Sequence, residues 1–232
     1  MTAVTRPPFV PFDELRAARI YQRNLPHWRQ EGCTYFVTFR LADSIPDGVR
    51  AQWAHEQGLW LKRHGIEFDG ARGQWHRAFE KLPRDEQFRF HKHFNRQVQS
   101  CLDRGLGACY LHDARCLKTV QSKLAAEDGS RDHLGDFVIM PNHVHLLITP
   151  VTGHKLEFIL KSIKGGSAVE CNRTLGRSGT FWQADSYDHI VRSLEELQAY
   201  REYIAANPGQ AGIVLPVEAQ YRAEWMDQWF RS

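Results

Sequence analysis

The chain has 232 residues, of which 42% are hydrophobic and 25% charged, and its formal net charge at pH 7 is +3. This length supports one sizeable core, or one core that carries a large insertion. No apolar run approaches the ~20 residues that are needed to cross a bilayer, so we expect no membrane partner. Residues 1–11 are polar and punctuated by proline, unlike a signal sequence. The slightly basic charge permits a nucleic-acid partner without requiring one.

The cysteines indicate a reducing environment. There are five of them, an odd number, and no pair is spaced C-x-x-C. This pattern argues against both a disulfide framework and a zinc knuckle, and we therefore expect a cytoplasmic protein.

The first part of the chain is predicted to be an arm followed by a strand. Residues 1–30 have the character of an N-terminal arm, in which 13–24 could form a short helix before a proline. Residues 35–42 are rich in aromatic and β-branched side chains, which favour a strand. A turn cluster at 43–48 ends that strand. We interpret 31–232 as a single domain.

Residues 44–110 are predicted to be a largely helical insertion into that domain. Aromatic side chains alternate there with arginines and lysines, a composition that suits single-stranded nucleic acid, because bases stack on rings and phosphates pair with guanidinium groups. Aromatics at helical spacing more often form a core, with the arginines on a solvated face, and we favour that interpretation. His91 and His93 could ligate a metal, although an exposed pair is the commoner case.

Two histidines stand two residues apart in the apolar run 141–148, which reads PNHVHLLI. The Pro-Asn dipeptide can turn the chain back onto 137–140, so the pattern predicts a hairpin. Side chains on a strand alternate between its faces, so His143 and His145 point the same way while their apolar neighbours point into a core. Two imidazoles on one face are half of a metal site. An exposed or hydrogen-bonded pair is the alternative.

Helices are predicted on both sides of this hairpin. Residues 114–127 form an amphipathic helix, and 156–175 form a second, longer one. Residues 180–190 are predicted to be a short strand or an extended segment. The buried stripe of the longer helix is predicted to be Phe158, Ile159, Ile163 and Val169.

The last element, 193–209, has marked ends. Ser193 and Glu196 form a capping box, and Pro208 with the following glycine is predicted to stop the helix. Tyr203 and Asn207 are four residues apart, so they lie one turn apart on the same face. A phenol and an amide oxygen are therefore presented together.

These parts can be joined into one chemical hypothesis. Two imidazoles and an amide oxygen give three ligands for Mg²⁺ or Mn²⁺, which keep open positions for substrate oxygens. Tyr203 is placed to attack a phosphate and to form a 5′-phosphotyrosine intermediate. Tyr187 and Tyr200 are competing nucleophiles, although Tyr200 also fits the buried stripe of its helix.

The same residues resemble a known family. The motifs resemble those of the REP-associated tyrosine transposases, which are relatives of the IS200/IS605 transposases among the HUH single-strand endonucleases. The resemblance covers about 33–42 and 111–214. The motifs that carry it are FVIMPNHVHLL at 137–147, SIK at 162–164, FWQ at 181–183, YDH at 187–189, VR at 191–192 and YIAANP at 203–208.

The resemblance implies both a fold and a set of roles. It implies that His143 and His145 are the metal pair, Tyr203 the nucleophile and Asn207 the third ligand. The implied fold is α+β, a ferredoxin-like antiparallel sheet backed by helices, with the tyrosine helix against the open face of the sheet. Residues 44–110 depart from the compact family pattern.

The expected partner is single-stranded or hairpin DNA, such as repetitive extragenic palindromes, bound by a monomer or a homodimer. Lys164, Arg173 and Arg192 are candidate phosphate contacts, but each could be a solvated charge. Trp182 could stack on a base, although a core position is commoner. Asp188 and His189 could brace the active site or bond a metal-ligating imidazole.

Two other functions stay open. The first is a non-catalytic DNA-hairpin-binding protein that retains the transposase fold, and the second is a metal-dependent hydrolase that uses the histidine pair with water. Retention of Tyr203 opposite a metal site favours the DNA-cleaving and DNA-joining enzyme.

Overall fold

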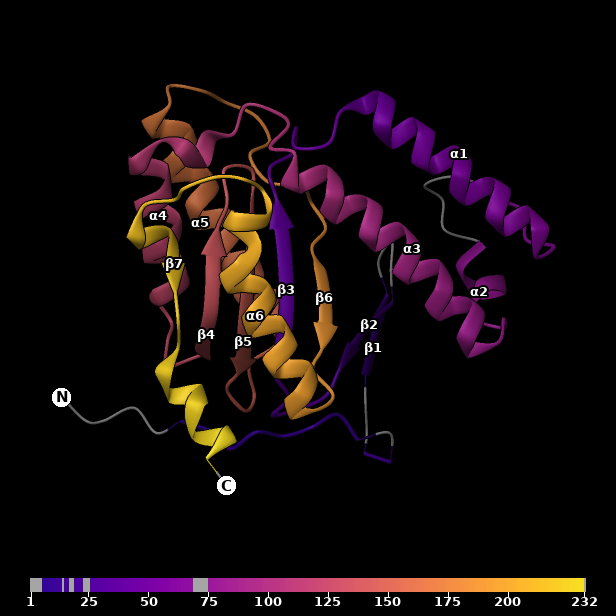
Figure 1. Ribbon diagram of the computed structural model, residues 1–232, viewed down its shortest axis with the longest axis horizontal. Helices are drawn as coiled ribbons and strands as arrows, with labels where there is room; N and C mark the ends of the chain where they lie inside the picture. Colours follow the sequence, from indigo (N-terminus) through magenta and orange to yellow (C-terminus); the bar gives the residue numbers. More distant parts are fainter. Residues whose placement is uncertain (1–5, 14, 17–18, 23–25, 69–74, 232) are drawn as a thin grey trace.

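A five-stranded antiparallel sheet organises the molecule (Figure 1). The computed structural model describes residues 6–13, 15–16, 19–22, 26–68 and 75–231. Its central sheet has the strand order β6-β3-β5-β4-β7. The strands are β3 (Tyr35–Arg40), β4 (Asp132–Ile139), β5 (His143–Pro150), β6 (Tyr187–Ile190) and β7 (Gln220–Tyr221).

The connections give the sheet its ferredoxin-like topology. Helix α4 (Ala114–Ala125) joins β3 to β4 through the inserted segment, and α5 (Leu156–Thr174) joins β5 to β6. The four strands so connected lie in the order β6-β3-β5-β4, with every pair antiparallel. The predicted α+β fold is therefore confirmed, and β7 extends it by one short strand beside β4.

Alternation along the strands produces two cores, one on each face of the sheet. Val144, Leu146 and Ile148 point to the face covered by α4 and α5, where they join the larger core. Leu147 points to the opposite face, where α6 (Leu194–Gln210) crosses the sheet (Figure 1). The prediction that the tyrosine helix lies against the open face of the sheet is therefore confirmed.

The segment between β3 and α4 is helical and builds small cores of its own. It contains α1 (Asp47–Arg63), α2 (Trp75–Phe79) and α3 (Arg84–Asp103), which project to one side of the sheet in Figure 1. The rings of four aromatic residues are buried there against one another: Trp75, Phe79, Phe90 and Phe94. The core interpretation of these aromatics therefore holds, and the rings are not an exposed stacking surface.

Several details differ from the predictions. The helix predicted at 13–24 is wrong where the structure describes it, because β1 (Arg19–Gln22) pairs with β2 (Pro26–Arg29) as a hairpin; positions 14, 17–18 and 23–24 lie outside the described residues. In α5, Phe158 and Val169 are 56% and 69% exposed, so they are not in the buried stripe. The predicted Ile159 and Ile163 are buried, and Leu156 and Leu160 complete the stripe with them.

The ends of α6 follow the capping chemistry only in part. Ser193 accepts a hydrogen bond from the backbone N–H of Glu196, as a capping box predicts. Pro208 does not stop the helix, which continues to Gln210. A proline lacks only its own N–H, so the later N–H groups still bond, as that of Ala211 does to the carbonyl of Asn207.

The C-terminal residues close the α6 face of the sheet. The turns η3 (Val217–Ala219) and η4 (Glu224–Phe230) flank β7, and η2 (Tyr110–His112) precedes α4.

Within the described ranges, none of the helices combines the length and the apolar character that a membrane span requires.

A buried ion pair ties α6 to the sheet. Arg201 is fully buried and donates to both carboxylate oxygens of Asp136 on β4, at 2.9 and 3.3 Å, and to Asp227 at 2.7 Å. Asp136 also accepts from the backbone N–H of Ala223 at 2.8 Å. The pair thus joins three parts of the chain on the face of the sheet that α6 covers.

We predict that Arg201→Met lowers the free energy of unfolding by about 3–5 kcal/mol, because it leaves a buried carboxylate without its cation. Urea unfolding followed by circular dichroism measures this change. The double variant Arg201→Met/Asp136→Leu should recover much of the loss, since it removes both charges.

Arg222→Met is the matched control. Arg222 also donates to Asp227, but its side chain is 56% exposed, and the substitution should cost below about 1 kcal/mol. Equal losses in Arg201→Met and Arg222→Met would contradict a special role for the buried pair.

Candidate active site

The two histidines of the hairpin occupy one face of β5, beneath α6. Both side chains are fully buried. In the register of the sheet, His143 lies opposite Arg40 and His145 lies opposite Thr38, both on the neighbouring strand β3. The predicted hairpin and its alternation are confirmed, and the pair is buried and hydrogen-bonded, so the exposed alternative does not hold.

Each imidazole is held at its Nδ1 atom, and the two Nε2 atoms face each other. His145 Nδ1 lies 2.7 Å from the Thr38 hydroxyl, and His143 Nδ1 lies 2.7 Å from Oδ1 of Asn142. The Nε2 atoms are 3.0 Å apart. The ring of His145 also stacks on Phe36, with 5.5 Å between centroids.

Asn142 determines which nitrogen of His143 carries the proton. Its Nδ2 atom donates to the carbonyls of Leu106 and Leu102, at 2.9 and 3.4 Å. Because carbonyls only accept, the amide must turn its oxygen toward His143, which then donates from Nδ1. The lone pair of His143 is therefore at Nε2, the atom that faces His145. A hydrogen-bond acceptor at the other ring nitrogen, here Asn142, commonly orients a metal-binding histidine in this way.

Burial keeps both imidazoles neutral. It lowers the pKa of His143 from 6.5 to about 3. It also lowers the pKa of His145 well below the ordinary value, and a charge on His143 would lower it further. Neutral imidazoles at neutral pH are the form that binds a metal ion.

Helix α6 brings Tyr203 and Asn207 to the same place. The Tyr203 hydroxyl lies 3.4 Å from His145 Nε2 and donates to Oε1 of Gln99 on α3 at 3.2 Å. Burial raises the pKa of Tyr203, the nearby charge of Asp103 raises it further, and a hydrogen bond with Asn207 opposes the rise. The phenol is half-buried and protonated at neutral pH.

Asn207 has one amide atom with a partner and one without. Its Nδ2 atom donates to Asp103 at 3.4 Å, whereas its Oδ1 atom is buried and has no hydrogen-bond partner. Leaving a buried acceptor unpaired costs about 1–3 kcal/mol, so such an atom in a polar centre indicates a missing ligand. A metal ion that takes imidazole and oxygen donors fits this set of atoms.

A metal site made of the two histidines would depend on the side-chain amide of Asn207 for an oxygen ligand. Over the described ranges, no group of three or more His, Cys, Asp and Glu side chains comes together as a metal site would require. The histidine pair alone would give a metal ion two ligands, and the unpaired Asn207 Oδ1 atom is the oxygen that the sequence-based prediction names as the third. With only three protein ligands, a bound ion would keep open coordination positions for substrate oxygens. Mg²⁺ and Mn²⁺ favour such an arrangement.

Several contacts in this centre were missed at the level of sequence. Gln99 and Asp103 come from the end of α3, and each is 104 residues away from the α6 side chain it contacts. No local pattern marks them. Asn142 was recognised as a turn residue, and its position beside His143 was the available signal for a second role.

The other two tyrosines lie elsewhere on the α6 face. Tyr200 stacks on Phe36 with 4.2 Å between ring centroids, and burial raises its pKa. Burial likewise raises the pKa of Tyr187 to about 12. Of the three tyrosines, Tyr203 is the one whose hydroxyl is within hydrogen-bonding distance of the histidine pair. The geometry thus favours Tyr203 as the nucleophile.

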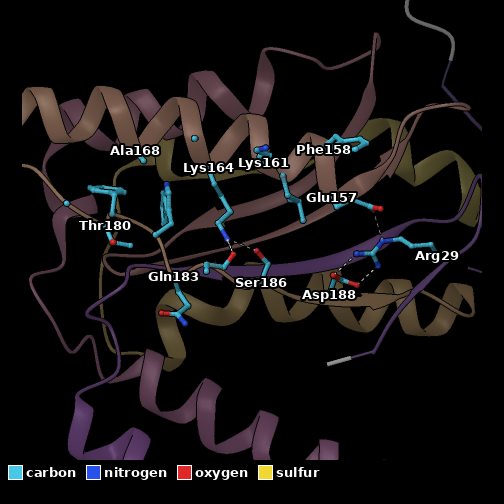
Figure 2. Close-up of a pocket in the computed structure, with 16 residues that line it drawn as sticks. Arg29, Glu157, Phe158, Lys161, Lys164, Ala168, Thr180, Gln183, Ser186 and Asp188 are labelled. Atoms are coloured by element: carbon cyan, nitrogen blue, oxygen red, sulfur yellow. Dashed lines mark hydrogen bonds and ion pairs between the residues drawn. The ribbon is translucent and has the colours of Figure 1, made fainter. Parts of the chain in front are cut away.

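Two of the predicted DNA contacts line a cavity of about 550 Å³ between α5 and residues 179–188 (Figure 2). Lys164 points across it and donates to the Ala184 carbonyl and the Ser186 hydroxyl, at 2.9 and 3.0 Å. The Trp182 side chain is 5% exposed, and its Nε1 atom donates to Ser167 at 2.9 Å. This core position argues against base stacking by Trp182.

The remaining predicted contacts lie apart from the histidines. Arg173 is exposed in the last turn of α5, and Arg192 is exposed just before α6. Asp188 accepts two hydrogen bonds from Arg29, and His189 pairs with Glu196 at 2.8 Å. Asp188 and His189 therefore brace the sheet edge and the start of α6 rather than a metal-ligating imidazole.

Comparison with known proteins gives a family match in sequence and several likenesses in structure. Residues 113–207 match the family model described as IS200-like transposase. A REP-associated tyrosine transposase, in a structure bound to a REP hairpin, is 14% identical, with a TM-score of 0.43 over 84% of this chain and 74% of that one. A protein of Deinococcus radiodurans R1 described as a transposase is also 14% identical, with a TM-score of 0.32 over 75% of this chain and 89% of that one.

The family match is the comparison that carries weight. Curated proteins include no match to this sequence, and TM-scores below 0.5 do not add to the fold described above. The matched stretch begins at the N-cap of α4 and ends at Asn207, so it contains both histidines and the tyrosine. Over residues 113–207, which include the candidate site, the chain is similar to the IS200-like transposase family.

Proposed function

We propose that this protein is a transposase, a metal-dependent endonuclease and strand transferase that acts on single-stranded or hairpin DNA through a 5′-phosphotyrosine intermediate. The observation that carries the proposal is the approach of the Tyr203 hydroxyl to within 3.4 Å of His145 Nε2. A nucleophile and a pair of neutral, converging imidazoles are the parts that phosphoryl transfer requires.

His143, His145 and Asn207 are the residues that would hold Mg²⁺ or Mn²⁺. When bound, the ion would withdraw charge from the scissile phosphate and favour ionisation of the attacking hydroxyl. The unpaired Oδ1 atom of Asn207 and the lone pair of His143 Nε2 support this assignment.

The chain's own residues account for the rest of the reaction. Gln99 holds the Tyr203 hydroxyl, which fixes the direction from which the oxygen approaches phosphorus. Attack forms the Tyr203 O–P bond and breaks the bond between phosphorus and the 3′ oxygen. The products are a 5′-phosphotyrosine and a free 3′-hydroxyl, and the phenol proton is balanced by the proton that the 3′ oxygen gains. Attack by a second 3′-hydroxyl reverses these steps and joins the strands.

The substrate proposal follows from the family and from the surface. Arg173 and Arg192 are exposed cations on the matched part of the chain, and Lys164 lines the cavity beside α5. We propose that such groups contact the phosphates of a repetitive extragenic palindrome or a similar hairpin. Tyr203, His143, His145 and Asn207 all come from one chain here, so the proposal needs no second copy, and it is compatible with a monomer or a homodimer.

We predict that Tyr203→Phe abolishes the covalent protein–DNA adduct while folding and hairpin binding survive, because only the hydroxyl is removed. Denaturing electrophoresis with labelled hairpin DNA detects the adduct, and a gel-shift titration measures binding.

Tyr200→Phe is the matched control, since it removes a hydroxyl one turn earlier on the same helix and should still form the adduct. An adduct that persists in Tyr203→Phe would exclude Tyr203 as the nucleophile. If wild type forms no adduct with any hairpin of its own genome but binds one tightly, the non-catalytic binding protein is the correct alternative.

We predict that cleavage needs Mg²⁺ or Mn²⁺ and ceases in excess EDTA. Polarisation of a phosphate by a metal is worth several kcal/mol, so His143→Ala and His145→Ala should each slow cleavage on the order of 1,000-fold with hairpin binding largely kept. Asn207→Ala should cost only about 10- to 100-fold, because water can replace a neutral amide ligand. Quantitative cleavage in EDTA would refute the metal site.

A further inference from the structure

Arg40 lies beside the histidine pair, on the same face of the sheet. Phe36 and Thr38 on β3 both contact His145, and strand alternation places Arg40 on their side. In the register of the sheet Arg40 is the direct partner of His143. Directly opposed residues on antiparallel strands have Cβ atoms about 4.5–5.5 Å apart, so the Arg40 side chain leaves the backbone next to that of His143.

A small cavity adjoins this position, between β3 and α3. Its volume is about 50 Å³, and Arg40, Thr38, Gln99 and Asp185 are among its lining residues. Thr38 contacts His145, and Gln99 contacts Tyr203. The cavity therefore shares two walls with the candidate active site and has room for a few water-sized groups.

Arg40 differs from the other enclosed arginines in its partners. Arg29 and Arg201 each pair with two carboxylates. Over the described residues, Arg40 forms no ion pair within 4 Å, and it donates to the neutral hydroxyl of Ser44 at 3.2 Å. Enclosing a guanidinium without an anion is costly, so its position needs another explanation.

The electrostatic surroundings of Arg40 indicate that its positive charge is poorly compensated in the cavity. Burial, with a smaller effect from the charge of Arg50, lowers the pKa of Arg40 to about 10. Asp185, the acid that lines the cavity, raises this pKa, but it is the weakest of the contributions. Arg40 stays charged at neutral pH with little local compensation.

We propose that Arg40 binds the non-bridging oxygens of the scissile phosphate in this cavity, and that it is a further catalytic residue. The inference rests on the proposed function, because it takes Tyr203 as the nucleophile. A guanidinium offers two parallel donors that match two phosphate oxygens. It would neutralise charge on the phosphate as the phenol oxygen approaches, and it makes and breaks no covalent bond.

The test is chemical rescue of Arg40→Ala. Single-turnover adduct formation at saturating hairpin DNA should fall by about 10²–10³-fold, the usual cost of removing one donor to a reacting oxyanion. Free guanidinium at about 20 mM should restore at least a tenfold increase, because it can enter the vacated space and supply the same fork of donors. Arg40→Lys should lie between wild type and Arg40→Ala.

Arg50→Ala is the matched control. Arg50 is an exposed arginine at the start of α1 and pairs with Asp47, so its loss removes the same charge outside the cavity. Its adduct rate should stay near that of wild type and should not respond to guanidinium. A wild-type rate in Arg40→Ala, or no rescue in a variant whose thermal unfolding matches wild type, would overturn the proposal.

Binding of inorganic phosphate separates this inference from the proposed function. At about ten times its Kd, and at ionic strength matched with chloride, phosphate should raise the melting temperature of wild type and Tyr203→Phe by roughly 3–5 °C. Arg40→Ala should show no rise. If wild type forms no adduct but this dependence on Arg40 holds, the enzyme proposal fails and the phosphate site stands. If the adduct forms and Arg40→Ala responds to phosphate like wild type, the phosphate site fails.

Discussion

Two imidazoles without any exposure to solvent impose the main constraint on this molecule, because each of their nitrogens must be hydrogen-bonded or hold a ligand. Thr38 and Asn142 satisfy the Nδ1 atoms, which leaves the Nε2 atoms directed at each other. Helix α6 must then cover this polar strip, and it does so with a phenol and an amide rather than with apolar groups alone. The ion pair between Arg201 and Asp136 anchors the helix on the same face of the sheet. On α6, the residue that anchors the helix, Arg201, is therefore distinct from Tyr203 and Asn207, which line the candidate site.

The end of α3 supports the centre at three points. Gln99 accepts from Tyr203, Asp103 accepts from Asn207, and the carbonyls of Leu102 and Leu106 accept from Asn142. A carboxylate only accepts hydrogen bonds, so Asp103 requires Asn207 to present its nitrogen to α3 and its oxygen elsewhere. Three of these four acceptors lie on α3, and Leu106 follows just beyond it. The last turn of α3 thus forms part of the wall of the candidate active site, whereas the buried aromatics between α1, α2 and α3 hold the segment together.

Local periodicity was sufficient to predict the sheet, the hairpin and the long helices, because alternation and capping are properties of a few neighbouring residues. The shared strand face of the two histidines and the shared helix face of Tyr203 and Asn207 could be predicted for the same reason. Contacts between distant segments could not be predicted: nothing in the sequence near Gln99 or Asp103 indicates that they meet α6. Phe158 and Val169 were misplaced because an apolar side chain on a helix need not face the core, and surfaces retain many apolar atoms. The paired strands near the N-terminus were missed because the composition of that stretch also allows a helix.

The two ends of the inserted segment meet at one point. The backbone N–H of Ala108 donates to the Asp43 carboxylate at 2.9 Å, and Gly107, at a φ of +89°, lies so close to Asp43 that a Cβ atom there would be 2.7 Å from the Asp43 carbonyl oxygen. The inserted segment therefore begins and ends at one place beside the end of β3. Because its two ends meet, the length of this segment does not set the spacing of β3 and β4 in the sheet, whereas the end of α3 is held in place by its contacts with Asn142, Tyr203 and Asn207.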